Sequence, residues 1–300
     1  MHDHDKPGRP PVEAPKQWGL TDDELAGAPL AFRSDLFAGQ VFLVSGGGSG
    51  LGRAMAYLMA RLGADVMICG RRAEKLAETA AGIEQRLGRR VATRAMTIRD
   101  PAQVEALVAE TWERFGRLDV LVNNGGGQFP QAALDYSVKG WHAVIDTNLN
   151  GTWWMMQAAA RQWRERGRPG SIVNIVAVVE RGMPQVAHTC AARAGVIYLS
   201  KSVAVEWAPL GIRVNCIAPG AVATEGLNVY PRAAAEAFRV SNPMKTLGDA
   251  LDIANAVAYV ASPETGKFIT GELLAVDGGR QMWGEDWPAG IPDYFRVSQR

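Results

Sequence analysis

Short apolar runs alternate with helical segments along this chain, and that alternation limits the folds that it can form. Residues 41–44, Val-Phe-Leu-Val, are typical of a strand that is buried on both faces. Residues 51–62 then follow helical periodicity, and the alternation continues as far as residue 276. Because parallel strands need crossovers of one hand, the pattern predicts an α/β fold, a doubly wound parallel sheet in a single domain.

The same periodicities give the expected elements. Strands are expected at 41–44, 65–69, 91–96, 118–123, 171–176, 213–218 and 273–276. Helices are expected at 51–62, 73–87, 101–115, 140–166 and 186–207. A main domain over 39–280 follows a polar N-terminal arm over 1–38 and precedes a C-terminal tail over 281–300. Within the arm, Trp18 and residues 20–37 are expected to pack on the body or on a neighbour.

Composition and charge exclude several classes of partner. The chain has 300 residues, 47% of them apolar, which suffices for one large core. Its 32 Lys and Arg against 31 Asp and Glu leave a net charge of +1, which attracts neither nucleic acid nor membrane. The sequence has no signal-peptide pattern and no apolar run that could span a membrane, so we expect a cytoplasmic protein.

Metal and disulfide sites are not expected. Cys69, Cys190 and Cys216 are an odd, widely spaced set without a Cys-x-x-Cys, which is typical of reduced thiols. His2 and His4 lie in a polar, Pro-rich stretch where histidines usually face solvent.

A glycine-rich loop joins the first strand to the first helix. Its sequence is Ser45-Gly-Gly-Gly-Ser-Gly-Leu-Gly52. A tight turn and a close backbone approach need residues without a Cβ, and the helix N-terminus then faces a diphosphate. The strand–loop–helix context therefore predicts a Rossmann-type dinucleotide site, and a glycine-rich turn without a ligand is the alternative.

The end of the second strand bears on which dinucleotide binds. An acidic residue there would bind the ribose 2′-hydroxyl, but this chain has Gly70-Arg71-Arg72. A guanidinium can bind phosphate oxygens in a bidentate manner, so NADP(H) is favoured and NAD(H) remains possible. In the alternative, both arginines only begin a solvated helix.

Five ordered motifs resemble those of the short-chain dehydrogenase/reductase superfamily over roughly residues 38–280. They are the glycine loop, Asn123-Asn-Gly-Gly126, Asn148-Leu-Asn-Gly151, Pro219-Gly-Ala-Val-Ala-Thr224 and Asp277-Gly-Gly279. The resemblance implies an oxidoreductase in which Asn148 holds a catalytic water and the segment 221–244 forms a mobile substrate lid. It also implies a set of cofactor-binding residues, namely Gly46, Ser49, Gly50, Leu51, Gly52, Arg71, Asn124, Gly125, Arg193, Pro219, Gly220, Val222 and Thr224.

One branch of the superfamily shares further features of this chain. The runs Asn123-Asn-Gly-Gly-Gly-Gln-Phe129, Gly140-Trp-His-Ala143 and Ala191-Ala-Arg-Ala-Gly195 resemble peroxisomal trans-2-enoyl-CoA reductases and, next, 2,4-dienoyl-CoA reductases. Asp286-Trp-Pro288 resembles the tail of that branch. The chain departs from it in ending Ser298-Gln-Arg300, without a peroxisomal address, and in carrying Thr189 where the branch has serine.

The superfamily's Tyr-x-x-x-Lys pair is missing. Aligning residues 194–197 puts Thr189 at the tyrosine and Arg193 at the lysine, and the serine of the triad falls near Ala177. Tyr198 does not replace the tyrosine, because it lies about 140° around the helix from Arg193. We expect it to be a packing residue.

This departure favours reduction of a C=C bond. A ketone becomes an alkoxide that needs a proton on oxygen, which a tyrosine with a lowered pKa supplies. An enoyl thioester becomes an enolate that takes its proton on carbon, so its oxygen needs only a hydrogen bond. Thr189 can donate that bond and Arg193 can hold a positive charge beside it. Alternatively, Thr189 is a helix N-cap and Arg193 is only a ribose ligand.

The sequence thus favours an NADPH-dependent reductase of a trans-2-enoyl-CoA-type thioester in fatty acid metabolism. We expect a homo-oligomer, and the resemblance implies a tetramer, as in most members of the superfamily. Two alternatives stay open. One is a carbonyl reductase or alcohol dehydrogenase with a relocated acid such as His188, and the other is a non-catalytic, cofactor-binding partner subunit. Trp283 and Trp287 are expected to line a neighbouring subunit's pocket or to lie in an interface core.

Overall fold

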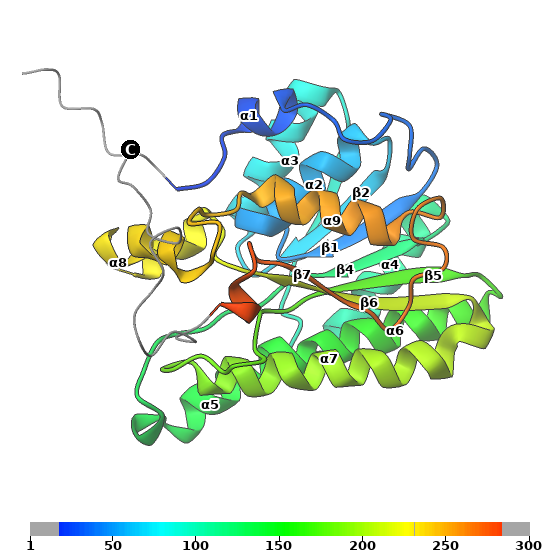
Figure 1. The fold of residues 1–300 in the computed structure, drawn as a ribbon. Coiled ribbons are helices and arrows are strands. Elements are labelled where there is room, and N and C mark those ends of the chain that lie inside the picture. Colours follow the sequence, from blue (N-terminus) through cyan, green and yellow to red (C-terminus); the bar gives the residue numbers. More distant parts are fainter. Residues whose placement is uncertain (1–17, 231, 284–300) are drawn as a thin grey trace, which may run out of the picture.

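The computed structural model of the chain describes residues 18–230 and 232–283, and it is built on one sheet (Figure 1). The sheet has seven strands in the order β3-β2-β1-β4-β5-β6-β7, and each neighbouring pair is parallel. The predicted doubly wound parallel sheet is therefore confirmed. Its strands are β1 (Val41–Ser45), β2 (Asp65–Gly70), β3 (Val91–Ala95), β4 (Val120–Asn123), β5 (Gly170–Ile175), β6 (Ile212–Pro219) and β7 (Leu273–Val276).

Helices cover both faces of the sheet (Figure 1). On one face a core cluster joins the sheet to α1 (Asp22–Gly27), α2 (Gly50–Arg61), α3 (Ala73–Leu87) and α9 (Ala250–Ala261). On the other face a second cluster joins it to α4 (Pro101–Phe115), α6 (Gly151–Glu165) and α7 (Ala187–Trp207). Central strands such as β1 are buried along their whole length, which explains their unbroken apolar runs.

Two parts of the helical pattern differ from the sequence prediction. The helix expected over 140–166 is two helices, α5 (Val138–Ile145) and α6, joined by a π-helical turn, Asp146–Asn150. Helix α9 was not predicted, although Asp249 caps it by accepting hydrogen bonds from the amides of Leu251 and Asp252. The small helix α8 (Arg232–Ala237) lies in the segment 221–244, between the turns Glu225–Val229 and Phe238–Ser241.

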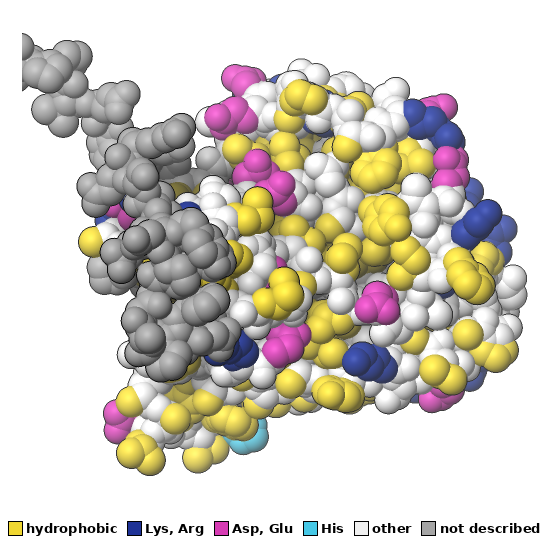
Figure 2. Space-filling view, in the orientation of Figure 1, with side chains coloured by type: hydrophobic (Ala, Val, Ile, Leu, Met, Phe, Trp, Pro, Cys, Tyr) yellow, Lys and Arg dark blue, Asp and Glu magenta, His cyan; other side chains and the backbone are white. Residues whose placement is uncertain are grey.

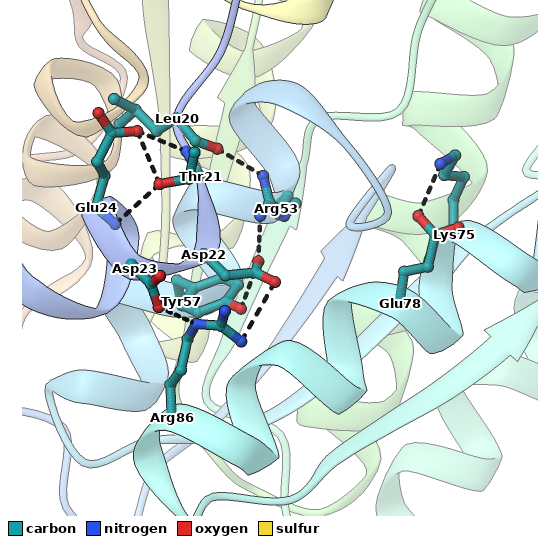
Figure 3. A network of polar contacts seen from close by, with 10 residues as sticks. All are labelled: Leu20, Thr21, Asp22, Asp23, Glu24, Arg53, Tyr57, Lys75, Glu78 and Arg86. Carbon is teal, nitrogen blue, oxygen red and sulfur yellow. Dashed lines mark hydrogen bonds and ion pairs between the residues drawn. The ribbon is translucent and has the colours of Figure 1, made fainter.

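The described part of the N-terminal arm packs on the body. Leu25 and Phe37 are buried, and α1 lies against α2 and α3. Asp22 lies at the centre of a polar network: it accepts a hydrogen bond from the Tyr57 hydroxyl at 2.6 Å, pairs with Arg53, and lies 3.5 Å from Arg86 (Figure 3). Arg53 also donates to the Leu20 carbonyl at 2.8 Å. The arm is thus tied to α2 and α3, the helices that follow β1 and β2.

The strand order reverses between β1 and β4, so the carboxyl ends of these strands border a crevice. A buried polar contact fixes the sheet next to it. Asn123, at the end of β4, donates to the Asn174 side chain on β5 at 2.8 Å, and Asn174 donates to Ser200 on α7 at 2.9 Å. These bonds hold α7 in register with the strand ends at the crevice.

Candidate active site

The glycine loop folds tightly onto the end of β4. Gly46 has a φ of +69°, and a Cβ there would lie 2.8 Å from the Asn124 amide nitrogen. A Cβ on Gly52 would overlap the Gly46 carbonyl. Positions 46 and 52 of the loop therefore have room only for glycine. Glycine at these positions also lets the backbone of the loop approach a diphosphate closely. This fits the predicted dinucleotide site, in which the N-terminus of α2 faces the loop.

Ser45 and Asn124 join the two strand ends. The Ser45 hydroxyl accepts hydrogen bonds from the amides of Asn124 at 3.0 Å and Gly125 at 2.9 Å. The Asn124 side chain donates to the carbonyls of Ser45 at 3.1 Å and Gly46 at 3.3 Å. The Asn124 amide group thus shapes the loop, a role that the sequence did not separate from direct cofactor contact.

A cleft of about 220 Å³ opens beside this loop, at the carboxyl ends of β1, β2 and β4. Arg71 lies in its wall, and so does Arg72, whose guanidinium lies 3.4 Å from the Ser49 hydroxyl. None of the described residues that line the cleft is acidic. Its cationic lining residues are Arg71, Arg72, Lys75 and Arg99.

The turn after β6 reaches the other side of the glycine loop. Pro219 ends the strand, and a Cβ on Gly220 would lie 2.6 Å from the Cα of Asp277. Val222 is buried in the core and pairs with Gly248, so it fixes the turn. Thr224 is buried and approaches Gly50. A second hollow, which contains Ser49, Gly50, Leu51 and Thr224 in its wall, brings these predicted residues together.

Arg193 is buried and points to the end of β4. Its Nη1 donates to the Ile175 carbonyl at 3.0 Å, and its Nη2 lies against Gly126. Burial lowers the pKa of Arg193 to about 10, so the guanidinium is still charged at neutral pH. The predicted charge is therefore present near the strand end where the cofactor site opens.

Asn148 lies in the π-helical turn and is buried. Its Oδ1 accepts from the Gly127 amide at 3.0 Å, and its Nδ2 donates to the Gly127 carbonyl at 2.9 Å. The side chain is thus engaged with the backbone that follows β4. The structure brings Asn148, Arg193 and the Gly126 backbone together.

Thr189 is the third residue of α7 and is buried, with 3% of its surface exposed. The N-cap of the helix is Val186, so the alternative that Thr189 is the cap is wrong. The Thr189 amide donates to the Val186 carbonyl at 2.9 Å and to His188 Nδ1 at 2.7 Å. Thr189 and Arg193 lie one turn apart on the same face of α7.

Tyr198, which we expected to be a packing residue, does not pack within the described part of the chain. It is 70% exposed, because α7 turns it away from the sheet, and Lys201 Nζ lies 5.1 Å from its ring centroid.

The three cysteines are unpaired. Burial raises the pKa of Cys69 to about 12 and that of Cys216 to about 11, so neither is a thiolate at neutral pH.

An aromatic cluster beside Thr189 was missed from the sequence. His188 is fully buried between Phe129 and Tyr136. The Tyr136 hydroxyl accepts from the Ala187 amide at 3.0 Å and donates to the Gln185 carbonyl at 2.8 Å. The run Gln128-Phe129 was noticed only as part of a motif, and Tyr136 gave no signal.

Part of the segment 221–244 contacts the residues that follow β4. The Tyr230 hydroxyl accepts from Gln128 Nε2 at 3.2 Å, and the Tyr230 ring meets Phe238 edge-on. Lys245 Nζ lies 4.3 Å from the centroid of the Trp283 ring.

Four residues named in the sequence analysis lie outside the described residues: His2, His4, Asp286 and Trp287. Within the described ranges, no helix is both long and apolar enough to cross a membrane.

A doubly wound sheet with a glycine-rich loop and a charged cleft at its switch point is typical of a dinucleotide-binding oxidoreductase. The chain matches the family described as Enoyl-(Acyl carrier protein) reductase over residues 14–281. It is 39% identical over 246 residues to a probable 2,4-dienoyl-CoA reductase of Bacillus subtilis (strain 168), covering 80% of this chain and 96% of that protein. This chain therefore belongs to the short-chain dehydrogenase/reductase family, whose members bind NAD(P)(H).

Two further similarities agree. A peroxisomal 2,4-dienoyl-CoA reductase of Danio rerio is 36% identical over 254 residues, with 83% of each chain covered. The solved structure of a short chain dehydrogenase from Bacillus anthracis is 37% identical and has a TM-score of 0.77. The match covers 84% of this chain and 100% of that one. The family and the Rossmann fold predicted from the motifs are confirmed.

Proposed function

We propose that the chain is an NADPH-dependent reductase of the C2–C3 double bond of a trans-2-enoyl-CoA-type thioester. The observation that carries the proposal is the pair on α7: a buried threonine hydroxyl and a buried guanidinium stand where the family has its tyrosine and lysine. Neither Thr189 nor Arg193 is an acid of the strength that ketone reduction needs near neutral pH.

The residues present suit an enolate better than an alkoxide. NADPH, when held by the glycine loop and the cationic cleft, would supply the hydride that C3 of the substrate accepts. Negative charge then develops on the thioester oxygen, where Thr189 donates a hydrogen bond and Arg193 supplies a positive charge. A water molecule from solvent would deliver the proton to C2, which completes the saturated thioester, and the hydroxide that remains would be neutralised in bulk solvent. Arg193 is held by the Ile175 carbonyl, so it does not need to reorganise during the step.

The charged cleft supports NADPH over NADH. The 2′-phosphate carries close to two negative charges, and a guanidinium binds such a group in a bidentate manner. Arg71 and Arg72 follow the strand end where the adenosine ribose lies in this fold, and the lining contains no acidic residue among those described. Arg72, already beside Ser49, is a second phosphate ligand that the sequence ranked below Arg71.

A 2,4-dienoyl-CoA is the second candidate substrate. Two relatives that the chain matches over most of its length are named 2,4-dienoyl-CoA reductases. A second conjugated double bond transmits charge to the same thioester oxygen, so the Thr189 and Arg193 pair serves either substrate.

The deciding experiment is an NADPH oxidation assay with trans-2-enoyl-CoA from crotonyl to hexadecenoyl, beside 2,4-dienoyl-CoA and the matching 3-oxoacyl-CoA. We expect turnover of the enoyl series to exceed that of the 3-oxoacyl series by at least about 10²-fold, since one oxyanion donor alone is worth that factor. Faster dienoyl turnover would select the second candidate. Turnover of the 3-oxoacyl series alone would overturn the proposal.

We further propose a homotetramer. Exposed apolar side chains lie on two different sides of the body. Tyr198 and Val205 are 70% and 78% exposed on α7, seven residues apart and so on one face of the helix. Phe268 and Tyr259 lie on the other side, by α9 and β7, where Figure 2 shows an apolar surface with few charges. A tetramer of two-fold symmetry needs two such self-complementary surfaces.

A further inference from the structure

His188 lies directly before Thr189 and is held on all sides by rings and backbone. None of its surface is exposed. Its imidazole stacks on Tyr136 at 4.6 Å between centroids with an interplanar angle of 3°, and it meets Phe129 edge-on at 4.7 Å. The hydrogen bonds of the Tyr136 hydroxyl to Ala187 and Gln185 fix that ring in turn. A ring enclosed in this way has one orientation.

The contacts of the ring define its protonation state. The Thr189 amide N–H, which also donates to the Val186 carbonyl at 2.9 Å, points at His188 Nδ1 from 2.7 Å, and two N–H groups cannot face each other at that distance. Nδ1 therefore carries no proton, and the neutral ring has its proton on Nε2. Burial lowers the pKa of His188 by more than its contacts with the backbone of Val186 and Phe129 raise it, which favours the neutral ring.

This tautomer has a consequence for the neighbouring hydroxyl. Nδ1 has a single lone pair, and the Thr189 amide occupies it. The Thr189 hydroxyl lies 3.4 Å from the same atom, so it finds no acceptor there. We propose that His188 is a positioning residue, which fixes the first turn of α7 and leaves the Thr189 hydroxyl proton for the substrate oxygen. The inference rests on the proposed function of Thr189.

The segment after β4 shows why this position matters. Four consecutive residues, 126–129, each contact a different part of the site. The first two meet Arg193 and Asn148, the third donates to Tyr230 in the segment 221–244, and the fourth packs on His188. The segment 126–129 thus contacts the first turn of α7 through His188, and this contact positions Thr189.

The test compares His188→Asn with His188→Leu, two side chains of similar shape. Asn keeps an acceptor on Cγ, where Nδ1 is attached to the ring, and Leu has none. Each is made alone and with Thr189→Val, and His188→Gln is added because its acceptor lies one bond further out. The measurements are kcat and KM for the enoyl-CoA, the Kd for NADPH and the thermal midpoint.

We expect His188→Leu and His188→Gln to lower kcat roughly 10- to 100-fold, the cost of a misplaced group. His188→Asn should recover most of that loss, while KM and the NADPH Kd stay within about threefold in all three. His188→Leu should lower kcat no further once Thr189→Val is present.

Two outcomes overturn the inference and leave the proposed function standing. One is that Asn is as poor as Leu and Gln. The other is that the losses of kcat caused by His188→Leu and by Thr189→Val multiply in the double variant. His188 would then act on turnover by a route other than Thr189. If Thr189→Val alone leaves kcat unchanged, the assigned role of Thr189 fails and the inference fails with it.

Discussion

Gly126 and Arg193 lie so close that no side chain fits between them: a Cβ on Gly126 would overlap the Nη2 atom of the guanidinium. The same Cβ would lie 3.0 Å from Asn148 Oδ1. The end of β4, the π-helical turn and α7 therefore meet at a point where only a glycine is tolerated. Arg193 keeps its place beside the cofactor site because the residue opposite has no side chain.

Gly126→Ala should displace Arg193. We expect kcat for the enoyl-CoA to fall roughly 10- to 100-fold, because the guanidinium moves from the developing charge. The added methyl group should also destabilise the fold by about 1–3 kcal/mol, as overpacking does. Steady-state kinetics and urea unfolding measure the two effects.

Gly127→Ala is the matched control. A Cβ on Gly127 meets nothing within 4 Å, and both of its backbone bonds to Asn148 are kept. Its kinetics should stay close to wild type. Equal losses in the two variants would show that the segment needs glycine for flexibility and not for the approach of Arg193.

Thr189→Val removes the proposed hydrogen-bond donor and keeps the shape of the side chain. Turnover of enoyl-CoA should fall about 10²–10³-fold, the effect of losing one oxyanion donor. NADPH affinity should barely move, because the glycine loop and the cationic cleft remain. Thr111→Val is the control, since Thr111 is also a buried helical threonine and its hydroxyl bonds only the Leu107 carbonyl in the described structure. A turnover within threefold of wild type for Thr189→Val would place the donor elsewhere.

Arg71→Ala should weaken NADPH binding by roughly 1.5–3 kcal/mol, the range for a hydrogen bond to a charged group. NADH affinity should change little, because NADH lacks the 2′-phosphate. Titration calorimetry with both dinucleotides measures the difference. Arg90→Ala, at a residue whose side chain is 92% exposed and outside the cleft lining, should leave both affinities unchanged. Equal wild-type affinities for NADPH and NADH would sink the assignment.

The sequence predicted those features that depend on neighbours along the chain. The strands are buried on both faces, and the glycine loop has one strand before it and one helix after it, so local periodicity and composition suffice for both. The π-helical turn that aims Asn148 at Gly127 adds no change in composition, and the segment therefore reads as one long helix.

Features built by distant residues were not predicted. The surroundings of His188 come from Phe129 and Tyr136, about fifty residues earlier, in segments without helical or strand periodicity. Tyr198 was expected to be a packing residue, but α7 directs its side chain to solvent, and the sequence near it does not show which face of this apolar helix meets the sheet. The contacts of Asp22 likewise join three helices and leave no local pattern.

Association should depend on α7. Wild type is expected to give a particle several times larger than the 32.3 kDa chain in light scattering. Val205→Glu places a charge on the exposed apolar face of the helix and should shift the mass downwards, because burying an unpaired charge is costly. Leu134→Glu, at a fully exposed leucine outside α7, should not. A 32 kDa particle for wild type at micromolar concentration would refute the assembly.

Asp22 should make the arm sensitive to acid. Burial raises its pKa, but hydrogen bonds from Tyr57 and Arg53 and the charges of Arg53 and Arg86 outweigh this, so the net pKa is lowered. A lowered folded-state pKa stabilises the fold above the unfolded value of about 3.9, and the stabilisation is lost as pH falls through the folded value.

Asp22→Asn should therefore destabilise the protein by about 1 kcal/mol at pH 7, a modest figure because the carboxyl is partly exposed to solvent. The difference from wild type should shrink below about pH 4, where the wild-type carboxyl itself takes up a proton. Urea unfolding at a series of pH values measures it. Asp35→Asn, at a carboxyl that is 71% exposed, should change stability little at any pH. If the difference in unfolding free energy between Asp22→Asn and wild type is the same at pH 3 and pH 7, the negative charge of Asp22 does not hold the arm. Its hydrogen bonds, independent of charge, would then hold it.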